Sequence, residues 1–429
     1  MAKKNIKETD NKEFTFDELD KYLSTIDPKG SRIDLNNYSK ITEWINSGNY
    51  LLNAQLSGSI RGGYANARAY ILAGENSVGK SFLALNACKN AQKQGYQIIY
   101  MDSEAAMDIE TVKKFGLDPA KVRYQPVLTT KQVRHFVINL CEKIKSLKER
   151  GIETPKLMLV LDSLGNLATE KERGDAISGS DKKDMTKQQE LRSLFRVITM
   201  DLAELKIPLI CTTHVYSSVG SFIGGNEISG GGGAKYVGSV MVELTKAQLK
   251  EDIDGDDTKK TGIIVTSNIK KNRFAKPHKI KFHISFYRGM NPYVGLEEFI
   301  SWDSCGIQRG KLLTENEFNK MYGDKDTKEA NYIRSTRFEF LEPETNKIKI
   351  LYFEPKETAR GFAVKHLGEC ISPKELFNPR VFTDEILNIL DEKVIKPYFS
   401  LPNINDDEEF DVLLENISEE NQEETETIL

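Results

Sequence analysis

Short apolar runs alternate with longer amphipathic segments between about residues 62 and 293. The short runs have the length and composition of strands, and the longer segments repeat their apolar residues every three or four positions, as helices do. Regular alternation of this kind is typical of an α/β domain with a mostly parallel central sheet. Strands are predicted at 69–73, 97–101, 123–127, 156–161 and 208–213.

Two long helices are predicted between these strands, over 131–149 and 182–205. The run from Leu157 to Leu161 is apolar at every position, which indicates a strand buried on both faces of a parallel sheet. Further along the chain the pattern changes from alternation with helices to a series of strand-like segments, which predicts hairpins. These segments lie at 240–246, 262–269 and 279–287.

The two ends of the chain have weaker patterns. Residues 1–60 are polar apart from an amphipathic piece over 14–26, in which Asp17 could cap a helix. Past residue 295 the periodicity weakens into what we expect to be a smaller α+β region. The expected divisions are an N-terminal segment (1–60), a core (61–295), a C-terminal region (296–404) and an acidic disordered tail (405–429).

Length and composition limit the class of protein. The chain has 429 residues, of which 39% are hydrophobic, so it can form two or three domains with a sizeable core. No apolar stretch reaches the ~18 residues that a membrane span needs, and the polar start, Met1 to Asn5, does not resemble a signal peptide. The five cysteines lack C-x-x-C spacing, which indicates reduced thiols in a cytoplasmic protein. They are Cys88, Cys141, Cys211, Cys305 and Cys370.

The net charge of −4 conceals an uneven distribution. Residues 405–429 contain eleven acids and no Lys or Arg, so the remainder carries 60 basic against 53 acidic residues. A mildly basic body with an acidic tail suits a polyanion-binding surface with an internal competitor. A tail that only keeps the protein soluble explains the same charges, and both interpretations stay open at this point.

A phosphate-binding motif lies between the first predicted strand and a helical segment. The octapeptide from Gly74 to Ser81 matches G-x-x-x-x-G-K-[ST] in the strand–loop–helix context that cradles phosphates. Lys80 would reach the β- and γ-phosphates, and the Ser81 hydroxyl would ligate Mg²⁺. The motif predicts binding of a nucleoside triphosphate with Mg²⁺. The expected contacts are Gly74, Glu75, Asn76, Ser77, Val78, Gly79, Lys80 and Ser81.

Polar residues follow three other predicted strands, and the carboxyl ends of parallel strands face the ligand crevice. Glu104 follows the second strand and is our candidate for the residue that polarises the attacking water, with Asp102 as the weaker candidate. Asp162 ends the apolar run and would hold the Mg²⁺ shell, through water. His214 follows the strand at 208–213, where it could touch the γ-phosphate and transmit its presence to the next loop.

Two glycine-containing segments follow these strand ends. Residues 215–233 include seven glycines with interspersed aromatic residues, and residues 169–185 combine glycine with basic charge. Loops of this length inside a compact domain are usually functional, and two on one side of an ATPase sheet suit a nucleic-acid strand, although they could be surface linkers. The candidate DNA contacts are Lys171, Arg173, Lys182, Lys183, Tyr216, Phe222, Gly224 and Gly225.

Several phrases in residues 58–293 resemble the RecA-type recombinases, most closely the UvsX recombinases of bacteriophages. They are 161–168 (LDSLGNLA), 192–196 (RSLFR), 101–104 (MDSE), 115–119 (FGLDP) and the glycine run before Ala234. Bacterial RecA has glutamine where this chain has His214, and the UvsX branch resembles this chain in having histidine.

The resemblance implies a DNA-dependent ATPase that uses ATP and Mg²⁺. It would form a helical filament on single-stranded DNA, search duplex DNA and exchange strands, in homologous recombination, repair and recombination-dependent replication. It further implies that Glu104 is the catalytic glutamate and that 169–185 and 215–233 are the DNA-binding loops. Mediator and single-strand-binding proteins are the implied partners, in the cytoplasm (of the host, if the protein is phage-encoded).

Residues 270–277 resemble the hairpin of this family whose two cations reach the ATP of the neighbouring protomer. Those cations would be Lys271 and Arg273. A cation supplied in trans stabilises the charge that develops in phosphoryl transfer, so ATP hydrolysis would require assembly. The N-terminal segment would then supply the polymerisation contact, with 14–26 docked on the next subunit. A solvated or DNA-facing basic patch is the simpler interpretation of the same residues.

Two other classes remain possible. A ring-forming replicative helicase or related motor ATPase shares the phosphate-binding loop, the glutamate and the trans cations, but it usually has a substantial N-terminal domain, and only about 60 polar residues precede this core. A signalling or clock-type ATPase would not need the two candidate DNA loops.

Overall fold

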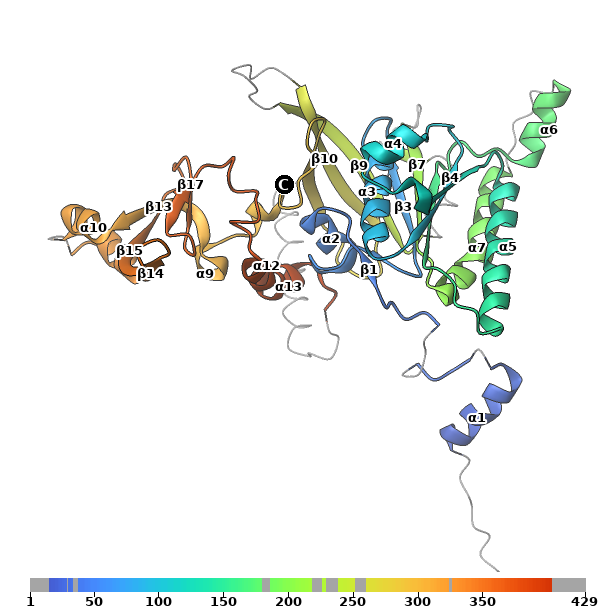
Figure 1. Cartoon of the computed structure of the whole chain (residues 1–429), viewed down its shortest axis with the longest axis horizontal. Helices are drawn as coiled ribbons and strands as arrows, with labels where there is room; N and C mark the ends of the chain where they lie inside the picture. Colours follow the sequence, from blue (N-terminus) through green and yellow to red (C-terminus); the bar gives the residue numbers. More distant parts are fainter. Residues whose placement is uncertain are drawn as a thin grey trace, which may run out of the picture.

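A computed structural model describes most of the chain, and Figure 1 shows how its elements are arranged. The described residues are 15–28, 30–33, 38–179, 186–217, 226–228, 238–250, 260–323 and 326–402. The tail expected at 405–429 lies outside them, as does the stretch of residues 181–185.

A large sheet organises the described part of residues 44–290, with ten strands in the order β12-β11-β10-β9-β3-β7-β6-β4-β5 and with β8 paired to β7. Neighbours from β9 to β5 are parallel, and β10, β11 and β12 extend the sheet as antiparallel strands. The mostly parallel α/β core is therefore confirmed. The bounds are β3 Ala69–Gly74, β4 Gln97–Asp102, β5 Val122–Pro126, β6 Leu157–Asp162, β7 Leu209–Ser217, β8 Asn226–Ile228, β9 Val240–Lys250, β10 Lys260–Lys271, β11 Lys279–Ser285 and β12 Gly289–Met290.

Helices cover both faces of this sheet. Along β3, Tyr70 and Leu72 belong to the hydrophobic cluster under α2 (Tyr50–Ser57) and α3 (Lys80–Lys93). Ile71 and Ala73 belong to the cluster under α5 (Thr130–Glu149) and α7 (Lys187–Leu205). The alternation follows from the period of two in a strand, and it explains why buried parallel strands are apolar throughout. Shorter elements are β1 Trp44–Ile45, β2 Tyr64–Ala65, α4 Ile109–Lys114 and η1 Pro119–Lys121.

The N-terminal sixty residues contain two different parts. Helix α1 (Phe16–Ile26) begins at Thr15, which forms a capping box with Glu18, so the prediction that Asp17 caps this helix is wrong. The eleven residues of α1 all lie exposed or half-exposed. Residues 44–60 instead belong to the core, because α2 is buried against the sheet, and the description of this stretch as merely polar was incomplete.

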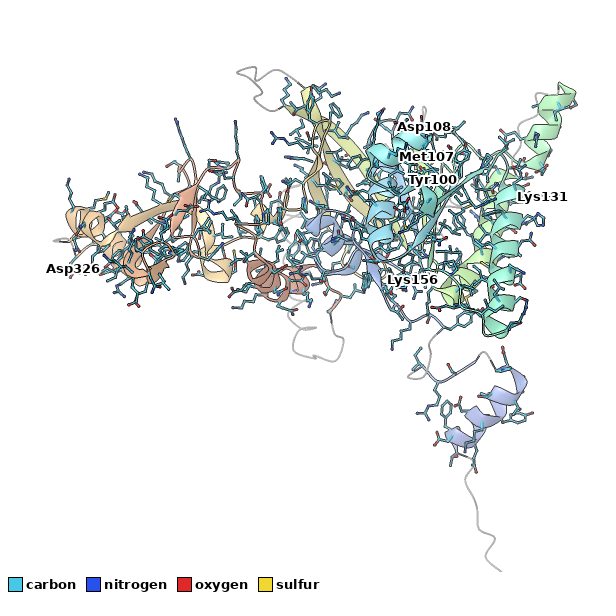
Figure 2. All side chains as sticks on the ribbon, in the orientation of Figure 1. Tyr100, Met107, Asp108, Lys131, Lys156 and Asp326 are labelled. Atoms are coloured by element: carbon cyan, nitrogen blue, oxygen red, sulfur yellow. The ribbon has the colours of Figure 1, made fainter. Side chains whose placement is uncertain are left out.

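The region after residue 295 contains a second sheet, of five antiparallel strands in the order β14-β15-β13-β16-β17. Figure 1 shows it beside the central sheet, and Figure 2 shows Asp326 in this region at the opposite end of the molecule from Lys131 of α5. The bounds are η2 Leu296–Glu298, α9 Trp302–Cys305, β13 Ile307–Thr314, α10 Glu315–Tyr322, α11 Lys328–Ser335, β14 Arg337–Glu342, β15 Lys347–Pro355, β16 Phe362–Val364, β17 Glu369–Ile371, α12 Asp384–Leu390, η3 Asp391–Ile395 and α13 Lys396–Phe399.

The last helices return to the core. Ile395 and Phe399 are fully buried in the same cluster as α2 and α3. The buried carboxylate of Asp391 accepts hydrogen bonds from Ser59 Oγ (2.6 Å) and Ile60 N (2.9 Å). This end of the C-terminal region is therefore joined directly to the segment that follows α2.

Two predicted segments differ from the structure. The expected loop 169–185 contains helix α6 (Glu170–Ser178), which begins at a capping box formed by Thr169 and Glu172. Helix α7 consequently begins at residue 187 rather than 182. Strand β7 runs through Ser217, so His214 lies within a strand and the glycine-rich segment begins later than predicted. In the part of the chain that the structure describes, no helix is long and apolar enough to cross a membrane.

Candidate functional site

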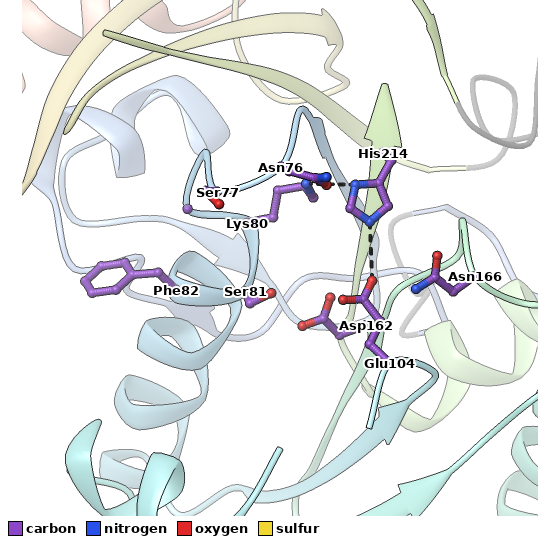
Figure 3. A pocket seen from close by; sticks show the side chains of 10 residues that line it. Asn76, Ser77, Lys80, Ser81, Phe82, Glu104, Asp162, Asn166 and His214 are labelled. Carbon is purple, nitrogen blue, oxygen red and sulfur yellow. Dashed lines mark hydrogen bonds and ion pairs between the residues drawn. The ribbon is translucent and has the colours of Figure 1, made fainter. Parts of the chain in front are cut away.

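A cavity of about 660 Å³ lies at the carboxyl ends of β3, β4, β6 and β7 (Figure 3). Four sequence-predicted residues from separate strands or their following loops line it together: Lys80, Glu104, Asp162 and His214. Its other lining residues are Asn76, Ser77, Gly79, Ser81, Phe82 and Asn166. The predicted nucleotide site is thus one cavity, although the role of each residue stays a prediction.

The phosphate-binding loop (Gly74–Ser81) connects β3 to α3 by a tight turn. Gly79 has φ 96°, a left-handed conformation that favours glycine, and it is the N-cap of α3. A Cβ at Gly74 would meet the Leu244 carbonyl oxygen at 2.7 Å. Within the described residues, no side chain caps α3. The first backbone N–H groups of α3 therefore remain available at the cavity, where they suit an anion such as a phosphate.

Lys80 supplies a cation within this loop. Its side chain is buried, and Nζ donates hydrogen bonds to the carbonyls of Gly74 (2.9 Å) and Glu75 (2.8 Å). Burial lowers the pKa of Lys80, whereas the carboxylates of Asp162 and Glu104 oppose that shift. A phosphate would bring further negative charge to the ammonium group and favour its charged form.

Glu104 and His214 face each other across the cavity (Figure 3). Glu104 Oε1 accepts a hydrogen bond from Ser163 Oγ (2.7 Å) and lies 3.3 Å from His214 Nε2. The other ring nitrogen, Nδ1, lies 3.5 Å from Lys80 Nζ. His214 therefore joins the carboxylate to the lysine, and all three side chains line the same cavity.

The geometry distinguishes Glu104 from Asp102, the weaker candidate. Asp102 is 3% exposed. Its carboxylate accepts backbone N–H groups from Glu104 (2.8 Å), Ala106 (2.9 Å) and Met107 (3.0 Å). Asp102 therefore shapes the turn that carries Glu104, whereas Glu104 itself lines the cavity.

Asp162 and Ser81, the predicted Mg²⁺ residues, both line the cavity. Asp162 accepts hydrogen bonds from Tyr100 OH (2.5 Å) and from Thr212 Oγ1. Burial and the charge of Asp162 raise the pKa of Tyr100, so the phenol remains a donor. The described residues contain no group of three His, Cys, Asp or Glu side chains that could hold a metal. The hydroxyl of Ser81 and the carboxylate of Asp162 at the cavity suit Mg²⁺, which usually keeps several waters and takes its other ligands from phosphate oxygens.

Four residues at or near the cavity were not predicted individually. Asn166 and Phe82 line the cavity, Tyr100 bonds Asp162, and Lys246 Nζ donates to the Asn76 carbonyl (2.6 Å). Asn166 follows the strand end that carries Asp162, which could have identified it. Lys246 comes from β9, and only the pairing of β9 with β3 brings it to the loop.

The structure describes only some of the predicted DNA contacts. Lys171 and Arg173 are exposed on α6. Tyr216 is part of β7, of which only the backbone is described there. The others lie outside the described residues: Lys182, Lys183, Phe222, Gly224 and Gly225.

Lys271 and Arg273 lie away from the cavity of their own chain. Ser267 of β10 pairs with Leu244 of β9, which pairs with Gly74. Four residues later, after an irregularity between Ile269 and Lys271, Lys271 is level with Met241, which pairs with Ile71 in the first half of β3. Met241 and Ile71 lie three residues before Leu244 and Gly74, so at about 3.3 Å per residue Lys271 lies roughly 10 Å along the sheet from the level of Gly74. Arg273 follows beyond the end of β10, on the same side.

Comparisons with known proteins identify relatives of this chain. The family model described as RecA N-terminal domain matches residues 17–291. The "Recombination and repair protein" of Enterobacteria phage T4 is 33% identical over 251 residues, which cover 57% of this chain and 60% of that protein. "Protein RecA" of Treponema denticola is 30% identical over 314 residues, which cover 67% of this chain and 70% of that protein. The chain thus spans about three fifths of the length of the first of these relatives.

Proposed function

This chain belongs to the RecA family, and we propose that it is an ATP-dependent DNA strand-exchange recombinase that forms helical filaments on single-stranded DNA. One observation carries the proposal: the nucleotide cavity lies at the carboxyl ends of the parallel strands, whereas Lys271, which Arg273 follows, lies toward their amino ends. Repeated head-to-tail contact between copies would bring the cations of one copy to the cavity of the next. Contacts of this kind generate open filaments or closed rings.

Within one chain, each of the main lining residues would have its own role in ATP hydrolysis. Lys80 and the N-terminus of α3 would bind the β- and γ-phosphates, and Glu104 would orient and polarise the attacking water. Ser81 and the water shell of Asp162 would hold Mg²⁺, which neutralises phosphate charge. His214 would touch the γ-phosphate and transmit its presence along β7, which ends at Ser217 and so includes the first three residues of the predicted loop 215–233.

Across the subunit interface, Lys271 and Arg273 would stabilise the charge that develops on the transferred phosphoryl group. Turnover would then depend on assembly, and assembly on DNA would stimulate turnover. Helix α1 supports the same arrangement. It presents exposed apolar side chains at helical spacing, and we propose that they dock on the adjacent subunit. They are Phe16, Leu19, Tyr22, Leu23 and Ile26.

The DNA would lie along α6 and the glycine-rich segment that follows β7. Lys171 and Arg173 are exposed and available to phosphates, which contribute most of the affinity of sequence-independent binding. Single-stranded and duplex DNA are therefore the proposed ligands. Mediator and single-strand-binding proteins are the proposed partners during repair and recombination-dependent replication.

Electron microscopy with ATP and single-stranded DNA tests assembly, and a strand-exchange assay tests activity. We expect helical filaments and joint molecules that require ATP. The Lys80→Ala protein is the control and should form neither. Closed rings with unwinding activity would instead support the helicase alternative, which the observations above do not favour.

A further inference from the structure

We propose that Gln55 and Asn272 are positioning residues that hold Lys271 and Arg273 in place for the neighbouring subunit's nucleotide. This inference rests on the trans role proposed above. It assigns a function to α2, which is otherwise part of the core, and to the short turn 272–278 between β10 and β11.

Gln55 bridges the two strands at the neck of this turn. Its side chain is fully buried. Nε2 donates to the carbonyls of Ser267 (2.9 Å) and His278 (2.7 Å), and Oε1 accepts from Ser267 Oγ (2.6 Å). The β10–β11 ladder ends at the pair Asn268–Lys279. Gln55 therefore fastens the strands at the point where backbone pairing stops.

Asn272 lies between the two cations and ties them to α2. Its Nδ2 donates to the backbone carbonyl of Gln55 (2.8 Å), and its Oδ1 accepts from Phe274 N (2.8 Å). One side chain thus folds the turn locally and anchors it to a buried helix. Two amides, one on each element, connect the same pair of segments.

The opposite side of the turn is braced by the last helix of the C-terminal region. Lys276 N donates to the Phe399 carbonyl (2.7 Å), and the His278 ring stacks on Tyr398 with centroids 4.0 Å apart. The ring of Phe274 packs edge-on against Trp44 at 5.7 Å. A turn of seven residues is consequently held on three sides, which is unusual support for a surface basic patch.

The bracing holds like charges together. Burial and the neighbouring charge of Arg273 lower the pKa of Lys271. Burial also lowers the pKa of the half-buried Arg68, and the charge of Arg273 adds to that shift. Mutual repulsion favours separation of these groups, and an anion between them would relieve it. A rigid, repelling pair of cations is therefore preorganised for phosphate, and loss of the tether would let the pair spread.

A displacement of about 1 Å in such a group can cost ~10²-fold in rate, and this sets the expected effect. The experiment measures ATP hydrolysis by wild-type subunits that are diluted into DNA-bound filaments of a silent Glu104→Gln partner. This partner keeps its own turn 272–278 and should sustain wild-type turnover. Adding Asn272→Ala to the silent partner should reduce wild-type turnover by about 10- to 100-fold as its fraction rises. Labelled partner in sedimented filaments verifies co-assembly.

Two further silent partners make the result decisive. A Glu104→Gln partner that also carries Lys271→Ala and Arg273→Ala removes the cations themselves. If turnover survives with it, the trans assignment in the proposed function is wrong. If turnover falls there but survives with Asn272→Ala, the positioning role alone is wrong.

The matched control for stability is Asn49→Ala in the same silent partner. Asn49 also anchors α2 through buried amide bonds, to the carbonyls of Asn291 (3.1 Å) and Val294 (2.8 Å), but away from the turn. Equal losses with Asn49→Ala and Asn272→Ala would mean that α2 merely loosens, which overturns the proposal. Asn272→Ser, whose hydroxyl can still accept from Phe274 N, replaces the alanine variant if that protein fails to fold.

Discussion

The nucleotide cavity and the turn 272–278 both present cations for phosphate, but they are built in different ways. In the cavity, His214 contacts both Lys80 and Glu104, so this cluster forms within one chain. The turn that carries Lys271 and Arg273 is held by α2 and α13 toward the amino ends of the parallel strands, and neither cation is among the residues that line this cavity.

The difference indicates which steps a single subunit can perform. A preassembled cavity can bind nucleotide before assembly, because its contacts are internal to the chain. In the proposed trans role, Lys271 and Arg273 would act only when a second copy brings its cavity to them. Binding and hydrolysis should therefore respond differently to mutation and to assembly.

The largest effect is expected from Lys80→Ala, which removes the buried cation of the cavity. Turnover should fall below detection, because Lys246, the nearby lysine, is not among the cavity-lining residues and bonds the Asn76 carbonyl. Steady-state hydrolysis with single-stranded DNA measures this. Substantial residual turnover would show that the cavity does not depend on its own lysine.

The double variant Lys271→Ala, Arg273→Ala should reduce turnover by about 10³- to 10⁵-fold, the range for cations supplied in trans, while each subunit still binds a fluorescent ATP analogue. Loss of turnover with retained nucleotide binding would distinguish the turn 272–278 from the cavity. Mixing with Lys80→Ala protein should restore part of the activity, because some interfaces then combine an intact cavity with intact cations. No recovery at any ratio, in verified mixed filaments, would contradict the trans assignment.

Glu104→Gln should lower turnover by about 10²- to 10⁴-fold, as loss of a general base does, with nucleotide binding and DNA-bound filaments retained. Asp102→Asn is the matched comparison, because this carboxylate is engaged with three backbone N–H groups. It should retain most turnover but lose about 1–3 kcal/mol of unfolding free energy. Wild-type turnover by the Glu104→Gln protein would move the catalytic role elsewhere.

The smallest effect is expected from deletion of residues 405–429, which belong to neither region. Removing eleven acids should strengthen duplex DNA binding most at low salt, because a tethered polyanion competes for the same surface. The gain should shrink above ~0.2 M salt, where the Debye length is below ~8 Å. Turnover saturated with single-stranded DNA should change little. Titrations of labelled duplex DNA into the full-length and truncated proteins test this competition. Equal affinities at low salt would leave the tail as a solubility or partner-docking segment.

The parts of the fold that were predicted correctly are those that local patterns specify. Strands β3, β4 and β6 were located to within one residue at each end, because buried strands are continuous apolar runs. The phosphate-binding loop was evident because its glycines, Lys80 and Ser81 are adjacent in the chain. Helix α6 was missed because Gly174 and several charges suggested a loop, whereas the capping box at Thr169 and Glu172 favoured a helix.

The sequence by itself determined the chemical groups of the site and the order in which they occur, since motif spacing and strand periodicity are local properties. Tertiary structure decided which groups meet. The sheet order placed β7 beside β3 and β6 beside β7, which brought His214 and Asp162 to the cavity. Strand β10 runs antiparallel to β9, which carried Lys271 and Arg273 toward the amino ends of the parallel strands. Strand order depends on long-range packing, which adjacent residues do not encode.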